Sequence, residues 1–193
     1  MAKKSTRNTR GRIVSAAWKL FYEQGYEDTT VEEIIELSGT SKGSFYHYFD
    51  GKDALLSTLS SLFDEKYEEL TGLLTPEMTA MEQLLFLNRE LFHMIEDSIS
   101  LDLLARLYST QLTTNGEKHL LDHNRIYYKL LRKIIAKGQA EGQLSSRSNV
   151  NEMVKLYALC ERALLYDWCL CAGEYALTEY SAKVLPGFLS SFL

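Results

Sequence analysis

The sequence predicts an all-α protein of about nine helices, and three observations lead to that prediction. Its 193 residues include only two prolines, so few positions would break a helix. Leucine and the charged helix formers are abundant. The alternation of apolar and polar residues that marks a β-strand is absent. We expect a three-helix head in residues 1–50 and a larger helical domain in residues 51–193.

The first predicted helix runs from Arg12 to Gln24 and ends at Gly25, a residue type common at helix C-termini. Its apolar residues repeat at helical spacing and predict a buried stripe of Ile13, Ala16, Ala17, Leu20 and Phe21. The segment before it has no acidic residue and carries Lys3, Lys4, Arg7, Arg10 and Arg12, although the whole chain has a net charge of −5. Such a basic segment is a candidate contact for DNA phosphates, but basic termini are also common by chance.

The second predicted helix has specific signals at both ends. Thr30 and Glu33 form a capping box, in which the hydroxyl accepts from a backbone amide and the carboxylate reaches back to the amide of the cap. The helix should therefore start at Thr30. It should end at Ser38, because Gly39 can adopt the left-handed conformation that stops a helix.

The third predicted helix is capped by Ser41. Phe45 and Phe49 are four residues apart and point inward, while the opposite side is small and polar. That outer side comprises Gly43, Ser44, Tyr46 and His47. Eight residues at about 1.5 Å each span roughly 12 Å, which is close to the width of the DNA major groove. The second and third helices together therefore predict a helix-turn-helix that can read DNA.

Six further helices are predicted from caps, apolar stripes and glycine stops. We expect them from Asp50 to about Leu70, from about Pro76 to Glu96, from Ser100, from Glu117 to about Ala140, from Asn149 to about Ala172, and from Thr178. Pro186 must kink the last helix or mark a second start.

Residues 12 to 56 resemble the DNA-binding domain of the TetR family of transcriptional regulators. The matching positions are Ile13, Ala16, Ala17, Leu20, Phe21, Gly25, Tyr26, Thr29, Thr30, Val31, Ile34, Gly39, Ser41, Gly43, Phe45, Tyr46, Tyr48, Phe49, Lys52, Leu55 and Leu56. The remaining three quarters of the chain are similar to the family only in length and helical character. The resemblance implies a DNA-binding homodimer, most often a repressor, with a ligand-binding domain after the head.

The resemblance also implies roles for individual residues. Those that resemble base-reading positions are Lys42, Gly43, Ser44 and His47, and those that resemble phosphate-binding positions are Thr30, Tyr46, Tyr48 and Lys52. Their chemistry agrees, because lysine can donate to guanine and tyrosine hydroxyls bind phosphates. Alternatives stay open: Tyr46 and Tyr48 could pack on neighbouring helices, Lys52 could be a solvated charge, and His47 could contact a sugar, a base or water.

The last two predicted helices carry more large apolar side chains than a one-sided helix needs. Candidate dimer contacts among them are Leu164, Trp168, Tyr180, Val184, Leu185, Phe188 and Phe192. Two copies of this helix pair could form an intermolecular four-helix bundle, as the resemblance also implies, and would then read a near-palindromic operator. Alternatively, the same residues pack the core of one chain.

The larger domain should enclose a pocket for a small-molecule effector whose identity the sequence does not reveal. Candidate lining residues are Phe92, Leu104, Tyr108, Tyr128, Tyr157, Cys160, Glu161 and Trp168. Aromatic residues at helical spacing are also typical of an ordinary core. Glu161 and Arg162 lie in an apolar helix, where a charge must be paired with another helix or used by a ligand.

No cofactor or metal site is predicted. His119 and His123 are four apart on a predicted helix with Asp122 between them, but a third correctly placed ligand is not evident. Cys160, Cys169 and Cys171 are odd in number, which favours a reducing compartment. The basic N-terminus is followed by no apolar run, and no stretch is long enough to cross a membrane, so we expect a cytoplasmic protein without a signal peptide.

The sequence does not predict an enzyme, because a nucleophile with its base, a phosphate-binding glycine loop and a metal cluster are all missing at diagnostic spacing. The favoured function is a ligand-responsive DNA-binding regulator that binds double-stranded operator DNA as a homodimer. The alternative is a helical ligand-binding or scaffolding protein whose helix-turn-helix makes only protein contacts. The basic N-terminal segment argues weakly against that alternative.

Overall fold

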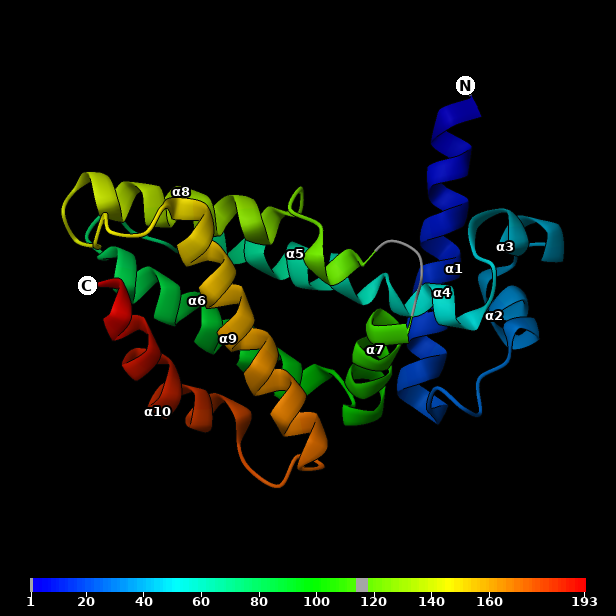
Figure 1. Cartoon of the computed structure of the whole chain (residues 1–193). Coiled ribbons are helices and arrows are strands. Elements are labelled where there is room, and N and C mark those ends of the chain that lie inside the picture. The colour runs from blue at the N-terminus through cyan, green and yellow to red at the C-terminus, as the bar shows by residue number, and fades with distance from the viewer. Residues whose placement is uncertain (1, 114–117) are drawn as a thin grey trace. The chain divides into compact units, whose positions relative to one another are not determined.

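The computed structural model describes residues 2–113 and 118–193, with side chains from residue 9 onward. Over these residues the regular structure is entirely helical, which confirms the predicted all-α class (Figure 1). The elements are α1 Ala2–Gln24, α2 Val31–Ser38, α3 Lys42–Tyr48, α4 Lys52–Leu56, α5 Leu59–Thr71, α6 Ala80–Ser98, α7 Leu101–Thr113, α8 Ile126–Ala140, α9 Val150–Leu170 and α10 Leu177–Leu189, with the 3₁₀ helices η1 His119–Leu121 and η2 Ser190–Phe192.

The predicted long fourth helix is in fact two helices, α4 and α5. The Ser57 hydroxyl donates to the Ala54 carbonyl at 2.7 Å, and the Thr58 hydroxyl donates to the Leu55 carbonyl at 2.6 Å. Hydroxyl groups that bond to the preceding turn compete with the backbone ladder and interrupt it. If α4 and α5 are counted as one element, the described residues contain the nine predicted helices.

Three helix boundaries differ from the prediction. Helix α1 begins at Ala2 rather than Arg12, so the basic segment is helical; the side chains of Lys3, Lys4 and Arg7 lie outside the described residues. Helix α6 begins at Ala80 rather than near Pro76, because Thr79 forms a capping box with Glu82. Helix α10 continues through Pro186 without a second start.

The helix predicted from Glu117 was wrong over its first part. Glu117 itself lies outside the described residues, and residues 118–125 form η1 and a turn before α8 begins at Ile126. The Asp122 carboxylate accepts from the Asn124 amide at 2.9 Å, a local bond that favours a turn over a helix. His119 and His123 therefore do not share a helix.

The chain divides into two compact units. Unit 1 comprises residues 1–61 and 102–115, and unit 2 comprises residues 62–101 and 116–193. Helix α7 thus belongs to the same unit as α1–α4, although it lies far along the sequence. The functional boundary predicted after residue 50 is not the boundary of these units, and it stays a prediction.

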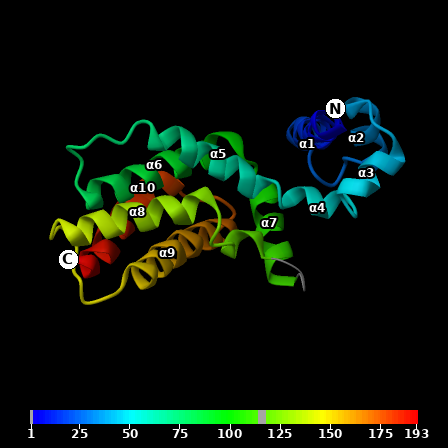
Figure 2. The ribbon, with the colours of Figure 1, turned by 90° about the horizontal axis from the view of Figure 1, so that it is seen from above.

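Unit 1 is built around three helices that pack against one another, α1, α2 and α3 (Figure 2). Ile13 and Phe21 from α1, Ile34 from α2 and Phe45 from α3 are at most 1% exposed. Burial of each such side chain contributes roughly 1.5–3 kcal/mol to the stability of the fold. This core holds α3 in place and leaves its other face to the solvent.

Unit 2 has α6 between α8 and α10, with α9 packed against both α8 and α10 (Figures 1 and 2). Its core includes Leu87, Phe92, Leu131, Tyr157 and Leu189, all of them fully buried. Within the described residues, no helix combines the length and the apolar composition needed to span a bilayer.

Candidate nucleic-acid interface and ligand groove

The N-terminus of α2 carries the predicted capping box. The Thr30 hydroxyl oxygen accepts from the Glu33 amide at 3.2 Å, and the Glu33 carboxylate accepts from the Thr30 amide at 2.7 Å. Hydrogen bonds to the Glu33 carboxylate hold its pKa below the usual value, and those donated by Thr30 have the largest effect. Thr30 is exposed, so the predicted phosphate-binding residue lies at the surface with its hydroxyl already engaged.

The C-terminus of α2 is held by a residue whose role the sequence did not reveal. Gly39 has the predicted left-handed conformation, with φ of 60°. The Arg12 guanidinium donates to the Gly39 carbonyl at 2.7 Å and also to the Ser38 carbonyl. A cation at the carbonyl end of a helix is favourable, because that end carries partial negative charge. The sequence suggested only that Arg12 adds to the basic segment.

Helix α3 presents a polar outer face, as predicted. Ser41 caps the helix by accepting from the Ser44 amide at 3.1 Å. Phe45 is fully buried and Phe49 nearly so, which confirms their inward direction. On the outer side Lys42, Gly43, Tyr46 and His47 are exposed, whereas Ser44 and Tyr48 are half-buried.

Lys42 forms only a weak, exposed ion pair. Its ammonium lies 3.3 Å from the Glu32 carboxylate, and both side chains are about 70% exposed. An ion pair so exposed contributes about 1 kcal/mol or less. Lys42 can therefore leave Glu32 for a stronger anion at little cost.

Lys52 is not the solvated charge that was the alternative to its predicted phosphate contact. Its ammonium donates to the carbonyls of Tyr26 at 2.6 Å, Glu27 at 3.2 Å and Thr29 at 2.9 Å, and lies 4.2 Å from the centre of the Tyr26 ring. All three donors of an ammonium are thus used by the α1–α2 connection. Lys52 fixes the segment that leads into α2, and its phosphate contact stays a prediction.

Tyr26 forms the centre of a polar cluster in unit 1. The Lys52 ammonium lies 4.2 Å and the Arg106 guanidinium 4.9 Å from the centre of its ring, and its hydroxyl donates to Asp53. Arg106 also pairs with Glu27 at 2.5 Å. Burial, followed by the Asp53 contact, raises the pKa of Tyr26. We call these five residues the Tyr26 cluster, and it ties α7 to the start of the helix-turn-helix.

Unit 2 contains a polar cluster of a different kind, which we call the buried polar cluster. Glu161 accepts from the Asn88 amide nitrogen at 2.9 Å and from the Tyr127 hydroxyl at 2.6 Å, and Ser181 donates to Asn88 at 2.5 Å. All four residues are at least nine-tenths buried. Burial raises the pKa of Glu161, an effect that the bonds from Tyr127 and Asn88 only partly offset. Glu161 is therefore paired with other helices of its own chain.

The predicted effector-binding residues are divided between the two units, and their ligand-binding role stays a prediction. Leu104 and Tyr108 lie on α7 in unit 1, and the other six lie in unit 2. Tyr108 is half-buried, and the others are buried: Phe92, Leu104, Tyr128, Tyr157, Cys160, Glu161 and Trp168. Burial raises the pKa of the Cys160 thiol to about 11, so it is protonated near neutral pH.

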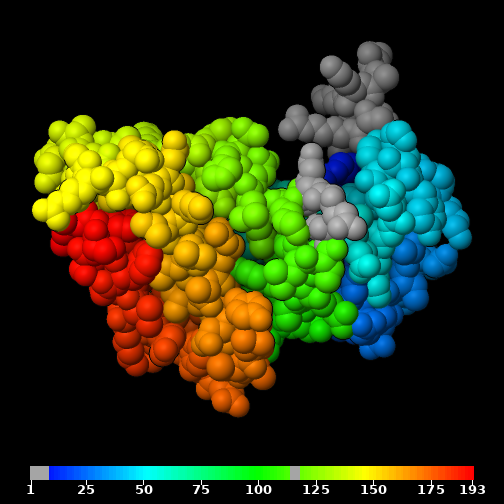
Figure 3. All heavy atoms as spheres, in the orientation of Figure 1, coloured from blue at the N-terminus to red at the C-terminus, as the bar shows by residue number. Residues whose placement is uncertain are grey.

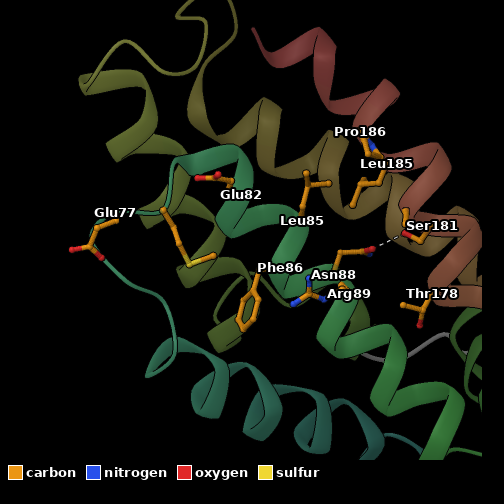
Figure 4. Close-up of a pocket in the computed structure, with 12 residues that line it drawn as sticks. Glu77, Glu82, Leu85, Phe86, Asn88, Arg89, Thr178, Ser181, Leu185 and Pro186 are labelled. Atoms are coloured by element: carbon orange, nitrogen blue, oxygen red, sulfur yellow. Dashed lines mark hydrogen bonds between the residues drawn. The ribbon is translucent and has the colours of Figure 1, made fainter.

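A groove in unit 2 lies instead between α6 and α10 (Figure 4). This α6–α10 groove has a volume of about 660 Å³. It is lined by Glu77, Met78, Glu82, Leu85, Phe86, Asn88, Arg89, Thr178, Ser181, Ala182, Leu185 and Pro186. None of the eight predicted effector-binding residues is among them. The sequence could not reveal this groove, because its two walls are about 90 residues apart in the chain.

The predicted dimer residues fall into two groups. Leu164, Trp168, Leu185 and Phe192 are buried within the chain, whereas Tyr180 is exposed and Val184 and Phe188 are half-buried. The exposed apolar side chains of α9 are ones that we did not predict, Leu159, Tyr166 and Leu170. Figure 3 shows α9 and α10, in orange and red, next to each other on one face of unit 2. The spacing of the α9 residues was a usable signal, because they share one side of the helix.

Within the described residues, no three His, Cys, Asp or Glu side chains gather closely enough to hold a metal ion. The three cysteines are free thiols, Cys160 buried and Cys169 and Cys171 half-buried.

Comparison with known proteins identifies the head. Residues 13–59, which contain the capping box, the Gly39 stop and α3, match the family model of the bacterial regulatory proteins of the tetR family. The chain belongs to the TetR family of transcriptional regulators. This TetR-family assignment also supports the expectation that the chain is not an enzyme, since the family acts by regulating transcription.

Similarity to individual relatives is strongest in the head. A Lactococcus lactis helix-turn-helix regulator is 39% identical over 56 residues, an alignment that covers 28% of this chain and 29% of the relative. The chain thus matches less than a third of the length of that curated relative. The fatty acid metabolism regulator of Bacillus subtilis is 23% identical over 93% of each chain.

Solved structures resemble nearly the whole chain. One of them is the crystal structure of Thermus thermophilus FadR, described as a TetR-family transcriptional repressor in complex with lauroyl-CoA. It has a TM-score of 0.76 and 26% identity, and the match covers 95% of each chain. The helical arrangement of this chain is therefore that of known TetR-family proteins.

Proposed function

We propose that this chain is a ligand-responsive transcriptional repressor that binds a near-palindromic operator as a homodimer. The outward polar face of α3 carries the proposal. Lys42, Gly43 and His47 are exposed while Phe45 anchors the helix beneath them. Lysine can donate to guanine, and a glycine without a side chain lets the backbone approach a base pair. The repressor role is supported by the description of the Thermus relative.

The homodimer is supported by the exposed apolar side chains of α9 and α10. Leu159, Tyr166 and Leu170 on α9 and Tyr180 on α10 are 41–66% exposed. A second copy that packed the same two helices against them would remove this apolar surface from water. Two heads related by a twofold axis would read two half-sites, which is why the operator should be near-palindromic.

The effector would act by binding one conformation of the dimer more tightly than the other. Repression is relieved if the favoured conformation has heads whose spacing no longer matches two major grooves. Similar proteins whose structures contain acyl-CoA molecules support the proposal that this chain binds an effector.

A gel-shift assay with DNA from upstream of the chain's own gene tests the DNA-binding proposal. We expect sequence-dependent binding that weakens steeply with salt, because phosphate contacts release counterions. Lys42→Ala should weaken binding, and Ser44→Ala or His47→Ala should alter sequence preference more than affinity for random DNA. Lys155→Ala, an exposed lysine on α9, is the matched control.

Two outcomes would contradict this proposal. If all three α3 variants bind the operator as the unchanged chain does, α3 is not the recognition helix. If the chain shows no sequence preference at all, the scaffolding alternative is favoured. The dimer is tested separately by sedimentation: Tyr166→Glu should yield monomers, whereas Leu73→Glu, at another exposed apolar side chain outside α9 and α10, should not.

A further inference from the structure

The α6–α10 groove has the size and the walls of a small-molecule site. Its volume of about 660 Å³ falls within the range of about 300–1,000 Å³ that is typical of ligand pockets. Leu85 and Phe86 from α6 form one wall and Ala182 and Pro186 from α10 form the other (Figure 4). These four side chains are exposed or half-buried. An apolar body laid between them would remove their surface from water.

Two carboxylates among the lining residues stay charged. The Glu82 carboxylate accepts from the amide and the hydroxyl of Thr79, and hydrogen bonds from Thr79 hold its pKa below the usual value. A hydrogen bond from Thr75 does the same for the pKa of Glu77. Both carboxylates are therefore ionised near neutral pH. Both are exposed, so a bound molecule can approach them.

The basic residue among the lining residues, Arg89, offsets only part of this charge. Its guanidinium donates twice to the Glu90 carboxylate, at 2.8 and 3.0 Å. It also lies 5.4 Å from the centre of the Phe86 ring. The position of Arg89 shows that the face of Phe86 accepts a cation. The lining thus carries two carboxylates and one guanidinium, and it keeps an excess of negative charge.

The floor of the groove is polar but already satisfied. Ser181 donates to the Asn88 carbonyl oxygen, as Figure 4 shows, and the Asn88 amide nitrogen donates to Glu161. The Ser181 hydroxyl and one N–H of Asn88 are therefore already used within the chain. An anion in the groove could bind only Arg89, in competition with Glu90, and would be repelled by Glu77 and Glu82, whereas a cation would be attracted by both carboxylates.

We propose that the α6–α10 groove binds a small amphipathic cation, with an apolar body between the two helices and a positive group towards Glu77 and Glu82. Binding of this cation does not depend on the proposed function, but its role as the effector does. The groove also lies apart from the exposed dimer side chains of α10: Ala182 and Pro186 line it, while Tyr180 and Val184 alternate with them on another face of the helix.

Calorimetric titration of the full chain without DNA tests the site with three probes that share one apolar body. These are 4-phenylbutylamine, which is a cation, 4-phenylbutanol, which is neutral, and 4-phenylbutanoate, which is an anion. We expect the amine to bind about fivefold or more tightly than the alcohol, because one exposed ion pair has about that effect. We expect no measurable binding of the anion.

Two sets of variants separate charge from shape. Glu77→Gln combined with Glu82→Gln should reduce the affinity for the amine to that for the alcohol; glutamine keeps the capping box of α6 intact. Its control is Glu65→Gln with Glu68→Gln, a pair of exposed carboxylates on α5. Ala182→Trp should fill the groove and abolish binding of both probes, while Ala136→Trp, on the exposed face of α8, should not.

Binding of the alcohol or the anion as tight as that of the amine would overturn the proposal, and so would amine binding that survives Ala182→Trp. The gel shift is scored independently on the same protein. Loss of amine binding with operator binding intact would overturn the groove proposal alone. Amine binding without operator binding would overturn the proposed function alone.

Discussion

The two units use polar side chains in opposite ways. In unit 1 the polar residues of α3, such as Lys42 and His47, face the solvent above a buried Phe45. In unit 2 Asn88 and Glu161 are buried and bonded to each other. A polar group that faces water is available to a partner, whereas a buried and satisfied one is committed to the fold. The difference indicates that α3 can bind a partner directly, while a ligand of unit 2 must use a surface such as the α6–α10 groove.

The largest expected effect breaks the support beneath the polar face of α3. Phe45→Ala removes a fully buried ring that contacts Tyr46 and Phe49, and should lower the free energy of unfolding by about 3–5 kcal/mol. Tyr46→Ala, at an exposed neighbour, should cost about 1 kcal/mol or less. Urea denaturation measures both. Equal losses in the two variants would show that α3 has no inner and outer face.

The next effect tests whether the buried polar cluster is committed to the fold. Asn88→Ala leaves Glu161 and Ser181 without their shared partner in a buried site, and should cost about 1–3 kcal/mol. The matched control is Asn151→Ala, at an exposed asparagine on α9, which should change stability little. A loss no greater than that of the control would mean that water or another side chain satisfies the cluster.

The same contrast explains what the sequence could predict. The helix-turn-helix is specified by local chemistry: Thr30 and Glu33 are three residues apart, and Gly39 and Ser41 mark a stop and a start. Such signals act within a few residues, so they can be read without the fold. The start of α6 has the same kind of signal in Thr79 and Glu82, and this capping box, rather than Pro76, sets the first residue of the helix.

The interior of unit 2 could not be predicted in this way. Glu161 bonds to Asn88 and Tyr127, which are 73 and 34 residues away in the sequence. An apolar helix that contains a glutamate shows that some partner is needed, but not which one. The effector and dimer residues stay predictions for the same reason: helical spacing identifies an apolar side chain but does not distinguish core, cavity and interface.

A pH series sharpens the comparison further, because Glu161 should titrate differently from the exposed carboxylates. Burial raises its pKa, so the folded chain holds the proton to a higher pH than the unfolded chain does. The stability that this proton provides is present below the ordinary glutamate pKa and is lost as pH rises through the raised value. Relative to Glu161→Gln, the free energy of unfolding of the unchanged chain should therefore fall with rising pH. Urea denaturation of both proteins across this range measures the difference, and parallel curves would contradict a raised pKa.

The smallest expected effect concerns the Tyr26 cluster, where unit 1 itself commits polar groups to structure. Arg106→Gln removes the cation beside Tyr26 and the pair with Glu27, both partly open to solvent, and should cost about 1 kcal/mol or less. The consequence should be local, because Arg106 joins α7 to the segment that leads into α2. Amide hydrogen exchange should become faster in residues 25–29 but not in α9, and Arg147→Gln, at an exposed arginine, should change neither. Faster exchange throughout unit 1 would show instead that Arg106 supports the whole head. Polar side chains of unit 1 would then stabilise the fold to a greater extent than the exposed polar face of α3 indicates.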